Sequence, residues 1–296
     1  MAAGAPTVPD GLLLGAIDLH YHSAPSPFPR RLTPAGAARH YADAGFRAVV
    51  LKSHHHVTVM DVLSIQDLLL DELELEMYGG IALNAAVGGL NPAAVELCLH
   101  MGGKIVWFPT LSSRAHIDFH HHHVSNFPAS PLRPEAPITV LDDDGKLKPE
   151  AHEILELVRD SGTILASGHL SAPELLPLFE AAHAIGIEKL LVQHPNFVLG
   201  LTHDDARRLT ALGAYIEHSV IMYDPDGPAG LPIGEFTEWI TAVGAERTVF
   251  GSDTGQATSP APGDIYRCVA GLLLDSGLSE DDVRKMAVEN AAVLLA

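Results

Sequence analysis

The sequence predicts an α/β fold, a closed (β/α)₈ TIM barrel, from two observations. Eight apolar, β-branched runs alternate with helical segments, as parallel strands joined by crossover helices do. A chain of 296 residues also suffices for one such barrel, so we expect a single domain over residues 1–296. The strand-like runs are 15–20, 47–52, 78–83, 104–108, 163–169, 189–194, 214–219 and 248–253.

Capping signals place helices between several of these runs. Thr33-Pro34, Asn91-Pro92 and Ser171 each precede a helical segment that stops at a glycine. The connection between the fourth and fifth runs, residues 109–162, is unusually long. Because loops after barrel strands lie on the catalytic face, we expect it to act as a lid or a substrate wall. We expect its four adjacent histidines, His120 to His123, to form a solvated loop tract.

Composition argues against several classes of function. A formal net charge of −19 repels phosphate backbones, so we expect no nucleic-acid partner. No apolar run approaches the roughly 20 residues of a membrane span, and the N-terminus lacks the features of a secretory signal. We therefore expect a cytoplasmic protein that acts on a small molecule, with no membrane partner. Two cysteines, far apart, make a disulfide or thiolate metal site improbable, and a homo-oligomer stays open.

Four of the strand-like runs end in residues that can bind a metal ion. "DLHYH" supplies His20 and His22, "ILASGHLS" supplies His169, "LLVQHPN" supplies His194 and "VFGSDTG" supplies Asp253. The carboxyl ends of barrel strands meet on one face, and residues i and i+2 of a strand share a side. Imidazole with carboxylate suits Zn²⁺, and also Mn²⁺ or Fe²⁺. The sequence therefore predicts a site for one or two divalent ions.

The order of these residues resembles the amidohydrolase superfamily of metal-dependent barrels, with HxH after the first strand, His after the fifth and sixth, and Asp after the eighth. The C-terminal "MAVENAAVLLA" is similar to the helix that closes many members, so the resemblance spans residues 15–296. It implies His20, His22, His169 and Asp253 as metal ligands, and His194 as a ligand of a second metal or a catalytic histidine. It also implies that Asp253 deprotonates a metal-bound water, which then attacks an amide, cyclic amide, lactone or ester bond.

The sequence departs from the superfamily at the end of the fourth strand. Binuclear members carry a bridging lysine or glutamate there, whereas this chain reads "KIVWFPTLSS", with Thr110 at that place. Lys52 in "VVLKSHHHVT" and Glu217 in "AYIEHSV" are candidates to replace the bridge. Lys52 could instead act as a general base, stabilise an oxyanion or hold a substrate carboxylate. His54, which shares a strand face with Lys52, and Asn84 are candidates to line the pocket.

Other interpretations of the same residues stay open. A mononuclear decarboxylase or hydratase of the same superfamily is compatible with the missing bridge. A phosphoesterase of the PHP type also begins with "DLHxHS", but has a histidine directly after its late Ser-Asp, where this chain has Thr254. A barrel that binds metal without catalysis is the remaining alternative.

Overall fold

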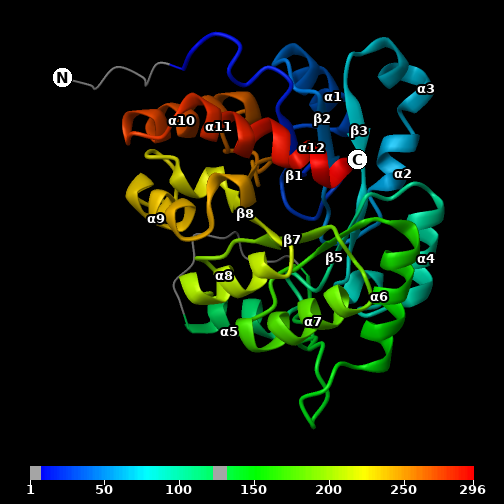
Figure 1. Cartoon of the computed structure of the whole chain (residues 1–296). Coiled ribbons are helices and arrows are strands. Elements are labelled where there is room, and N and C mark those ends of the chain that lie inside the picture. Colours follow the sequence, from blue (N-terminus) through cyan, green and yellow to red (C-terminus); the bar gives the residue numbers. More distant parts are fainter. Residues whose placement is uncertain (1–7, 123–131) are drawn as a thin grey trace.

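A computed structural model of the chain describes residues 8–122 and 132–296 (Figure 1). Its strands are all parallel to their neighbours, and the helices surround them. The strands are β1 (Ile17–Tyr21), β2 (Ala48–Leu51), β3 (Glu76–Tyr78), β4 (Gly80–Ala82), β5 (Ile105–Trp107), β6 (Ile164–Ala166), β7 (Leu190–Gln193), β8 (Tyr215–Ser219) and β9 (Thr248–Gly251).

The hydrogen-bonded order of the strands is that of a (β/α)₈ barrel. β1, β2 and β3 form one sheet, and β4 to β9 follow in sequence order in a second. Only Gly79 separates β3 from β4, so these two short strands are one bent run that links both sheets. At the other seam, a parallel bridge joins Tyr21 to Thr254, and the Asp253 amide donates to the His20 carbonyl at 2.8 Å. The predicted fold class is therefore confirmed.

Helices cover the outside of the strands. The three helices with predicted caps, α1 (Pro34–Asp43), α4 (Pro92–His100) and α7 (Ala172–Ala184), begin at the expected residues. The helices are α1 (Pro34–Asp43), α2 (Val59–Leu63), α3 (Gln66–Leu69), α4 (Pro92–His100), α5 (Arg114–His122), α6 (Pro149–Ser161), α7 (Ala172–Ala184), α8 (His203–Ala211), α9 (Ile233–Val243), α10 (Pro262–Asp275), α11 (Glu280–Arg284) and α12 (Asn290–Leu295). A π-helical segment, Lys285–Glu289, joins α11 to α12, and short 3₁₀ turns lie at Leu70–Glu72, Ala85–Val87, Val220–Tyr223 and Ala245–Arg247.

The inside of the barrel is filled by side chains from nearly all the strands. Ile17, Leu19, Val50, Trp107 and similar residues form one buried cluster, separate from the clusters under the helices. The C-terminal helix α12 adds its apolar side to this interior cluster and closes the amino end of the barrel. The predicted closing role of "MAVENAAVLLA" is thus confirmed.

Strand β1 contains an irregularity that turns its histidines toward the barrel interior. Between Asp18 and Tyr21 its register with β2 shifts, so three steps on β1 match two on β2. Leu19 belongs to the interior cluster, and strict alternation would therefore turn His20 outward toward the helices. A bulge of this kind re-aims the following side chains. Tyr21 consequently packs outward against Tyr41, while His20 and His22 both face the pocket.

Two predictions about the long connection need correction. The interval 109–162 is not a continuous loop, because α5 follows β5 within it. His120, His121 and His122 belong to α5, and only His123 lies outside the described residues. The helix forms because the Ser113 hydroxyl accepts a hydrogen bond from the His116 amide and Phe119 packs against Phe197. The predicted lid function stays a prediction.

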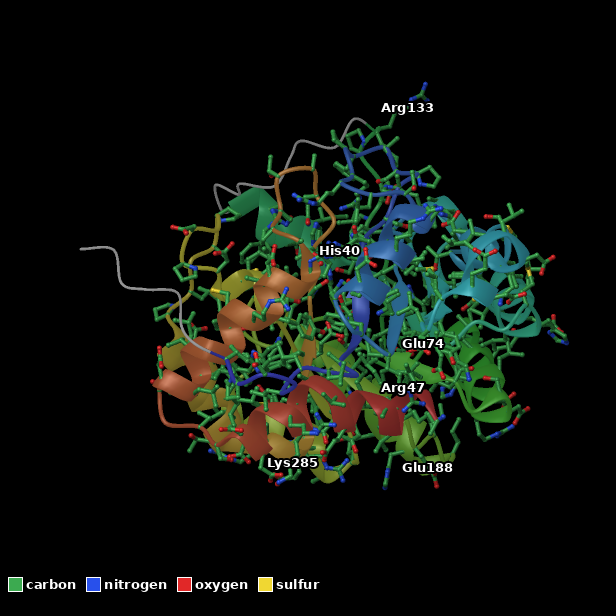
Figure 2. The ribbon with its side chains drawn as sticks, turned by 90° about the horizontal axis from the view of Figure 1, so that it is seen from above. His40, Arg47, Glu74, Arg133, Glu188 and Lys285 are labelled. Carbon is green, nitrogen blue, oxygen red and sulfur yellow. The ribbon has the colours of Figure 1, made fainter. Side chains whose placement is uncertain are left out.

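The outer surface carries the charge that the composition anticipated. Arg47, Glu74 and Glu188, which Figure 2 labels, are among the exposed charged residues. Among the helices of the described residues, none combines the length and apolarity needed to cross a membrane.

Asp18 joins the first and last strands from the outside of the barrel. Its buried carboxylate accepts hydrogen bonds at 2.9 Å from the amides of His20 and Ser252, and at 2.5 Å from the Tyr41 hydroxyl. One side chain thus satisfies two backbone donors that belong to opposite ends of the chain.

We expect Asp18→Ala to lower the free energy of unfolding by about 3 kcal/mol, because it leaves two buried amides without acceptors. Tyr41→Phe removes only the third hydrogen bond and should cost about 1 kcal/mol. Urea denaturation of both variants measures the difference. Equal losses in the two variants would contradict the role of Asp18 at the seam.

Candidate metal centre

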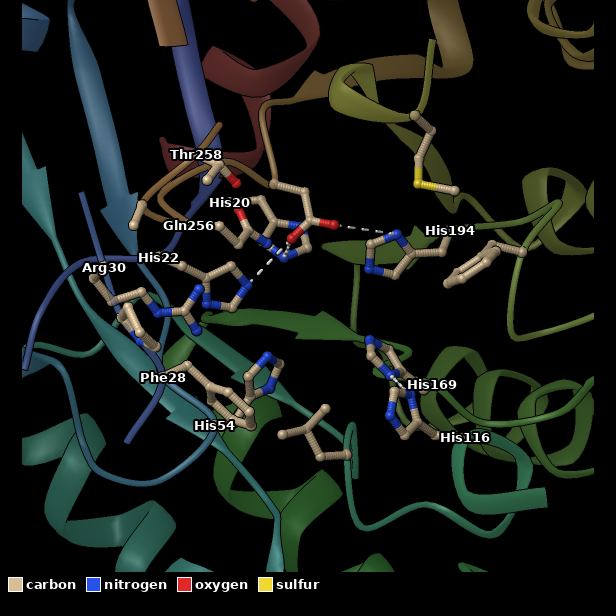
Figure 3. Close-up of a pocket in the computed structure, with 16 residues that line it drawn as sticks. His20, His22, Phe28, Arg30, His54, His116, His169, His194, Gln256 and Thr258 are labelled. Atoms are coloured by element: carbon tan, nitrogen blue, oxygen red, sulfur yellow. Dashed lines mark hydrogen bonds and ion pairs between the residues drawn. The ribbon is translucent and has the colours of Figure 1, made fainter. Parts of the chain in front are cut away.

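The predicted metal-binding residues meet in a pocket at the carboxyl ends of the strands (Figure 3). The pocket has a volume of about 270 Å³, which suits a small molecule. Its lining residues are His20, His22, Phe28, Pro29, Arg30, His54, Leu111, His116, His169, His194, Phe197, Met222, Asp253, Gln256, Ala257 and Thr258.

Three side chains from the first and last strands converge at the floor of this pocket. His20, His22 and Asp253 each offer one ligand atom within 4.8 Å of the others. The Nε2 atoms of His20 and His22 lie 3.1 and 3.2 Å from the same oxygen, Oδ1 of Asp253. Two imidazoles and a carboxylate are a donor set that zinc and related divalent ions accept.

The other ring nitrogens of both histidines are held from behind. Nδ1 of His20 donates to Glu217 Oε1 at 2.6 Å, and Nδ1 of His22 donates to the Lys52 carbonyl at 3.1 Å. Each ring is therefore held with Nδ1 as a donor, so that Nε2, once it has lost its proton to an arriving ion, offers a lone pair to the pocket, as a metal ligand must. The residues present thus fit a divalent ion. Gly251 makes room for this arrangement, since a Cβ there would lie 2.6 Å from the Glu217 carboxyl carbon.

A layer of buried polar groups lies beneath the three ligands. Gln193 donates from Nε2 to both oxygens of Glu217 at 3.0 Å and accepts from Lys52 Nζ at 3.2 Å. Glu217 therefore sits behind His20, on the Nδ1 side of the ring, and this placement favours an orienting role over the bridging role considered from the sequence.

Lys52 brings a positive charge close to the ligand set. Its Nζ lies 3.0 Å from His20 Nε2, the nitrogen that faces Asp253, and 5.4 Å from the centre of the Trp107 ring. Burial lowers the pKa of Lys52 to about 8, although the carboxylates of Asp253 and Glu217 oppose this shift. The amine therefore loses its proton more readily than an exposed lysine does.

The charges in the centre hold Asp253 in its ionised form. Burial raises the pKa of Asp253, but the His20 charge and the hydrogen bonds from His20 and His22 outweigh burial and hold the pKa well below its usual range. For His20, burial and Lys52 lower the pKa, and the carboxylates of Asp253 and Glu217 reverse this and raise it.

His194 stands on the other side of the Asp253 carboxylate. Its Nδ1 lies 3.9 Å from Asp253 Oδ2 and 2.9 Å from the Ser219 hydroxyl. Burial lowers the pKa of His194 to about 4, so the ring is neutral at pH 7. His194 and Asp253 both have φ of 50°, a left-handed conformation uncommon outside glycine. Such strained positions concentrate at functional sites.

His169 lines the same pocket but stands outside the group of three ligands. Its Nδ1 lies 3.0 Å from Nδ1 of His116 on α5, and its Nε2 is buried with no hydrogen-bond partner. Burial, reinforced by the charges of His116 and His194, holds the pKa of His169 well below its usual range. When the proton of the neutral ring is on Nδ1 and is donated to His116, the unpartnered Nε2 is available to a bound ion or to a substrate.

The remaining predicted residues form a support at the opposite wall. Thr110 Oγ1 contacts Nδ1 of His54 at 2.8 Å and accepts from Asn84 Nδ2 at 2.7 Å. His54 lines the pocket, whereas Thr110 and Asn84 are buried behind it. His218 turns outward and stacks on Phe236 with ring centres 4.3 Å apart, as its alternation with Glu217 predicts.

Sequence reasoning missed three residues that the structure places at the site: Gln193, His116 and Arg30. Gln193 directly precedes His194 at the end of β7, so a search of both final strand positions would have found it. The "SSRAH" cap signal could have placed His116 on a helix. No local signal marks Arg30, because its approach depends on the fold of the loop after β1.

Taken together, the fold and the site define a (β/α)₈ barrel with a His-His-Asp group at the carboxyl ends of its strands. The chain belongs to DUF6282, a family of unknown function whose profile matches residues 15–217. The matched region holds every candidate ligand except Asp253. No protein with a curated description matches the sequence.

Several solved structures of similar fold bear the names of hydrolases. An amidohydrolase from Pseudomonas aeruginosa superposes with a TM-score of 0.65 at 13% identity, covering 96% of each chain. A probable dipeptidase from Pseudomonas aeruginosa gives 0.59 at 13% identity, again over 96% of each chain. A mutant of a phosphotriesterase-like lactonase from Deinococcus radiodurans gives 0.58 at 12% identity, with 96% of each chain covered. The chain therefore has the fold of the amidohydrolase superfamily, as the resemblance implied.

We expect His22→Ala and Asp253→Asn each to lower the content of bound divalent metal severalfold, because each removes one of three converging donors. His100→Ala, a change at an exposed position of α4, is the control and should keep the wild-type content. Elemental analysis of untagged protein measures the ratio of metal to chain. Equal metal content in all three variants would contradict the site.

We expect Glu217→Gln to weaken metal binding by about 10- to 100-fold, because the amide no longer supports His20 as a carboxylate does. Competition with a chromophoric chelator measures this change. An unchanged affinity would show that His20 does not ligate the ion through Nε2.

Proposed function

We propose that the protein is a metal-dependent hydrolase that cleaves an amide, cyclic amide, lactone or ester bond in a small molecule. The ion that we propose for this site is Zn²⁺, with Mn²⁺ or Fe²⁺ as alternatives. The observation that carries it is the convergence of His20, His22 and Asp253 at the floor of a pocket. The names of the structural neighbours, which include an amidohydrolase, a dipeptidase and a lactonase, support the same reaction class.

In this proposal His20, His22 and Asp253 hold the ion, and His169 is placed to join them through its unpartnered Nε2. A bound divalent ion would lower the pKa of a coordinated water toward neutrality and polarise a carbonyl group. Glu217 and the Lys52 carbonyl keep the two histidine rings in the tautomer that ligation needs.

Asp253 is the residue best placed to receive a proton. Its Oδ1 faces His20 and His22. Its Oδ2 is directed toward His194, and this is the oxygen that can accept a proton. His194 is neutral at pH 7 and can hydrogen-bond a substrate oxygen or leaving group from the opposite side. Lys52, whose pKa is about 8, lies below the ligands and adds positive charge near a developing oxyanion.

A mononuclear decarboxylase is the second candidate function. One group of three ligands is found among the described residues, and Thr110, at the end of β5, supports His54 and Asn84 and offers no bridge. One ion suffices for this alternative, which shares the site but forms CO₂.

We expect Asp253→Asn to lower kcat by about 100-fold or more on any substrate found in a screen of amides, cyclic amides, lactones and esters, because the proton acceptor is lost. Lys52→Met should keep the bound metal, because Lys52 is not among the three ligands. It should lose activity, because the positive charge near the developing oxyanion is removed. Loss of one metal ion in Lys52→Met would instead identify Lys52 as a ligand.

The same screen separates the candidates when it includes aromatic carboxylic acids and measures CO₂ release. Metal-dependent CO₂ release without hydrolysis would contradict the proposed hydrolase function and support the decarboxylase function. A barrel that binds metal without catalysis would lose metal in Asp253→Asn while every assayed rate stayed at background.

A further inference from the structure

Arg30 is a cation in the pocket wall that no carboxylate of residues 8–122 and 132–296 contacts directly. Its guanidinium lines the pocket and lies beside His22 (Figure 3). Within residues 8–122 and 132–296 its side chain makes no ion pair and no hydrogen bond, and its Nε is fully buried. Asp253 is the sole acidic residue among the lining side chains, and it is engaged by His20 and His22. Asp253 attracts the charge of Arg30 without contacting it. A partly buried guanidinium with no direct contact to an anion is costly, so a ligand that supplies one would be favoured.

The backbone around Arg30 is held in place by the loop after β9. Arg30 and Gln256 form an antiparallel bridge, and the Arg31 amide donates to the Gly255 carbonyl at 2.8 Å. Gly255 has φ of 115°, and a Cβ there would lie 1.8 Å from the His22 carbonyl oxygen. The loop that carries Arg30 is thus attached to the segment that follows Asp253, so the backbone of Arg30 has a fixed position relative to the metal ligands.

The rest of the wall is suited to an apolar group. Phe28, Leu111, Phe197 and Met222 line the pocket together with the histidines, most of which are neutral because burial lowers their pKa values. A molecule that fits this space would place an anion against Arg30 and apolar atoms against these side chains.

We propose that Arg30 is the recognition residue for a carboxylate on the substrate, and that the substrate is a small carboxylic acid with an apolar portion. A guanidinium offers a planar fork of N–H donors, and its two terminal nitrogens, which are not among the fully buried atoms, match the two oxygens of a carboxylate. This inference rests on the proposed function, because it names the substrate class of that same pocket. The carboxylate at Arg30 is the recognition group, and the bond that reacts lies toward Asp253.

The experiment measures binding of acetate, phenylacetate and 3-phenylpropionate against their neutral amides by calorimetry. The protein is used as purified and again after chelation, since a carboxylate could also bind a metal ion. We expect each phenyl acid to bind about 10-fold more tightly than its amide in both states, and more tightly than acetate. Arg30→Gln should reduce the acids to the affinity of the amides, and Arg30→Lys should retain part of the preference.

Arg39→Gln removes the same charge from an exposed position of α1 and should leave the preference unchanged. The melting temperature of each variant shows whether it is folded. If Arg30→Gln is destabilised, the affinities of Arg30→Lys for acid and amide test the proposal instead. Equal affinity for acid and amide, or a preference unaffected by Arg30→Gln, would overturn the proposal, as would tighter binding of benzylphosphonate than of phenylacetate. Because binding is measured with and without metal, absence of hydrolysis would refute the proposed function without touching this result.

Discussion

The seam between β1 and β9 is the constraint on which the rest of the molecule depends. It joins the Asp253 amide to the His20 carbonyl, the His22 amide to the Thr254 carbonyl, and the Asp18 carboxylate to the Ser252 amide. These contacts close the barrel, and they also bring the HxH pair next to the aspartate. Barrel closure and assembly of the candidate metal centre are therefore one structural event, and the site cannot exist in a chain whose ends are apart. Contacts of such long sequence separation form only after most of the chain is ordered.

Stability and function oppose each other in the layer just below the pocket. The barrel interior is apolar around Trp107 and Val249, yet above it lie Lys52, Gln193 and Glu217, all fully or almost fully buried. Apolar side chains of similar size would avoid the cost of desolvating two charges. The polar groups satisfy one another's hydrogen bonds, because Gln193 connects Lys52 to Glu217, and Glu217 in turn holds His20. A network of this kind fixes ring orientation at the expense of packing energy.

The sequence predicts the fold and the strand ends well, because both follow from periodic patterns and from the shared direction of parallel strands. It predicts side-chain direction less well. Simple alternation from Leu19 would have turned His20 outward, and the bulge that corrects this has no local signature. The loop prediction for His120 was wrong because a cap at Ser113 and packing of Phe119 on Phe197 stabilise a helix that a run of histidines does not suggest. Arg30 was missed because only a tertiary contact with Gln256 places it in the pocket.

The pocket and the surface of this protein differ in electrostatic character. The chain carries a formal net charge of −19, and that field attracts metal cations and repels anions at a distance. Inside the pocket the balance changes, because the charged lining side chains are Arg30 and Asp253, and His20 and His22 already engage the Asp253 carboxylate. A negatively charged substrate would thus meet repulsion on approach and attraction on arrival. Because salt screens exposed charges more than buried ones, the distant repulsion weakens with ionic strength while the contact with Arg30 persists. In the proposed hydrolase, the acidic surface would therefore favour loading of the metal, and discrimination among substrates would fall to the few charges that line the pocket.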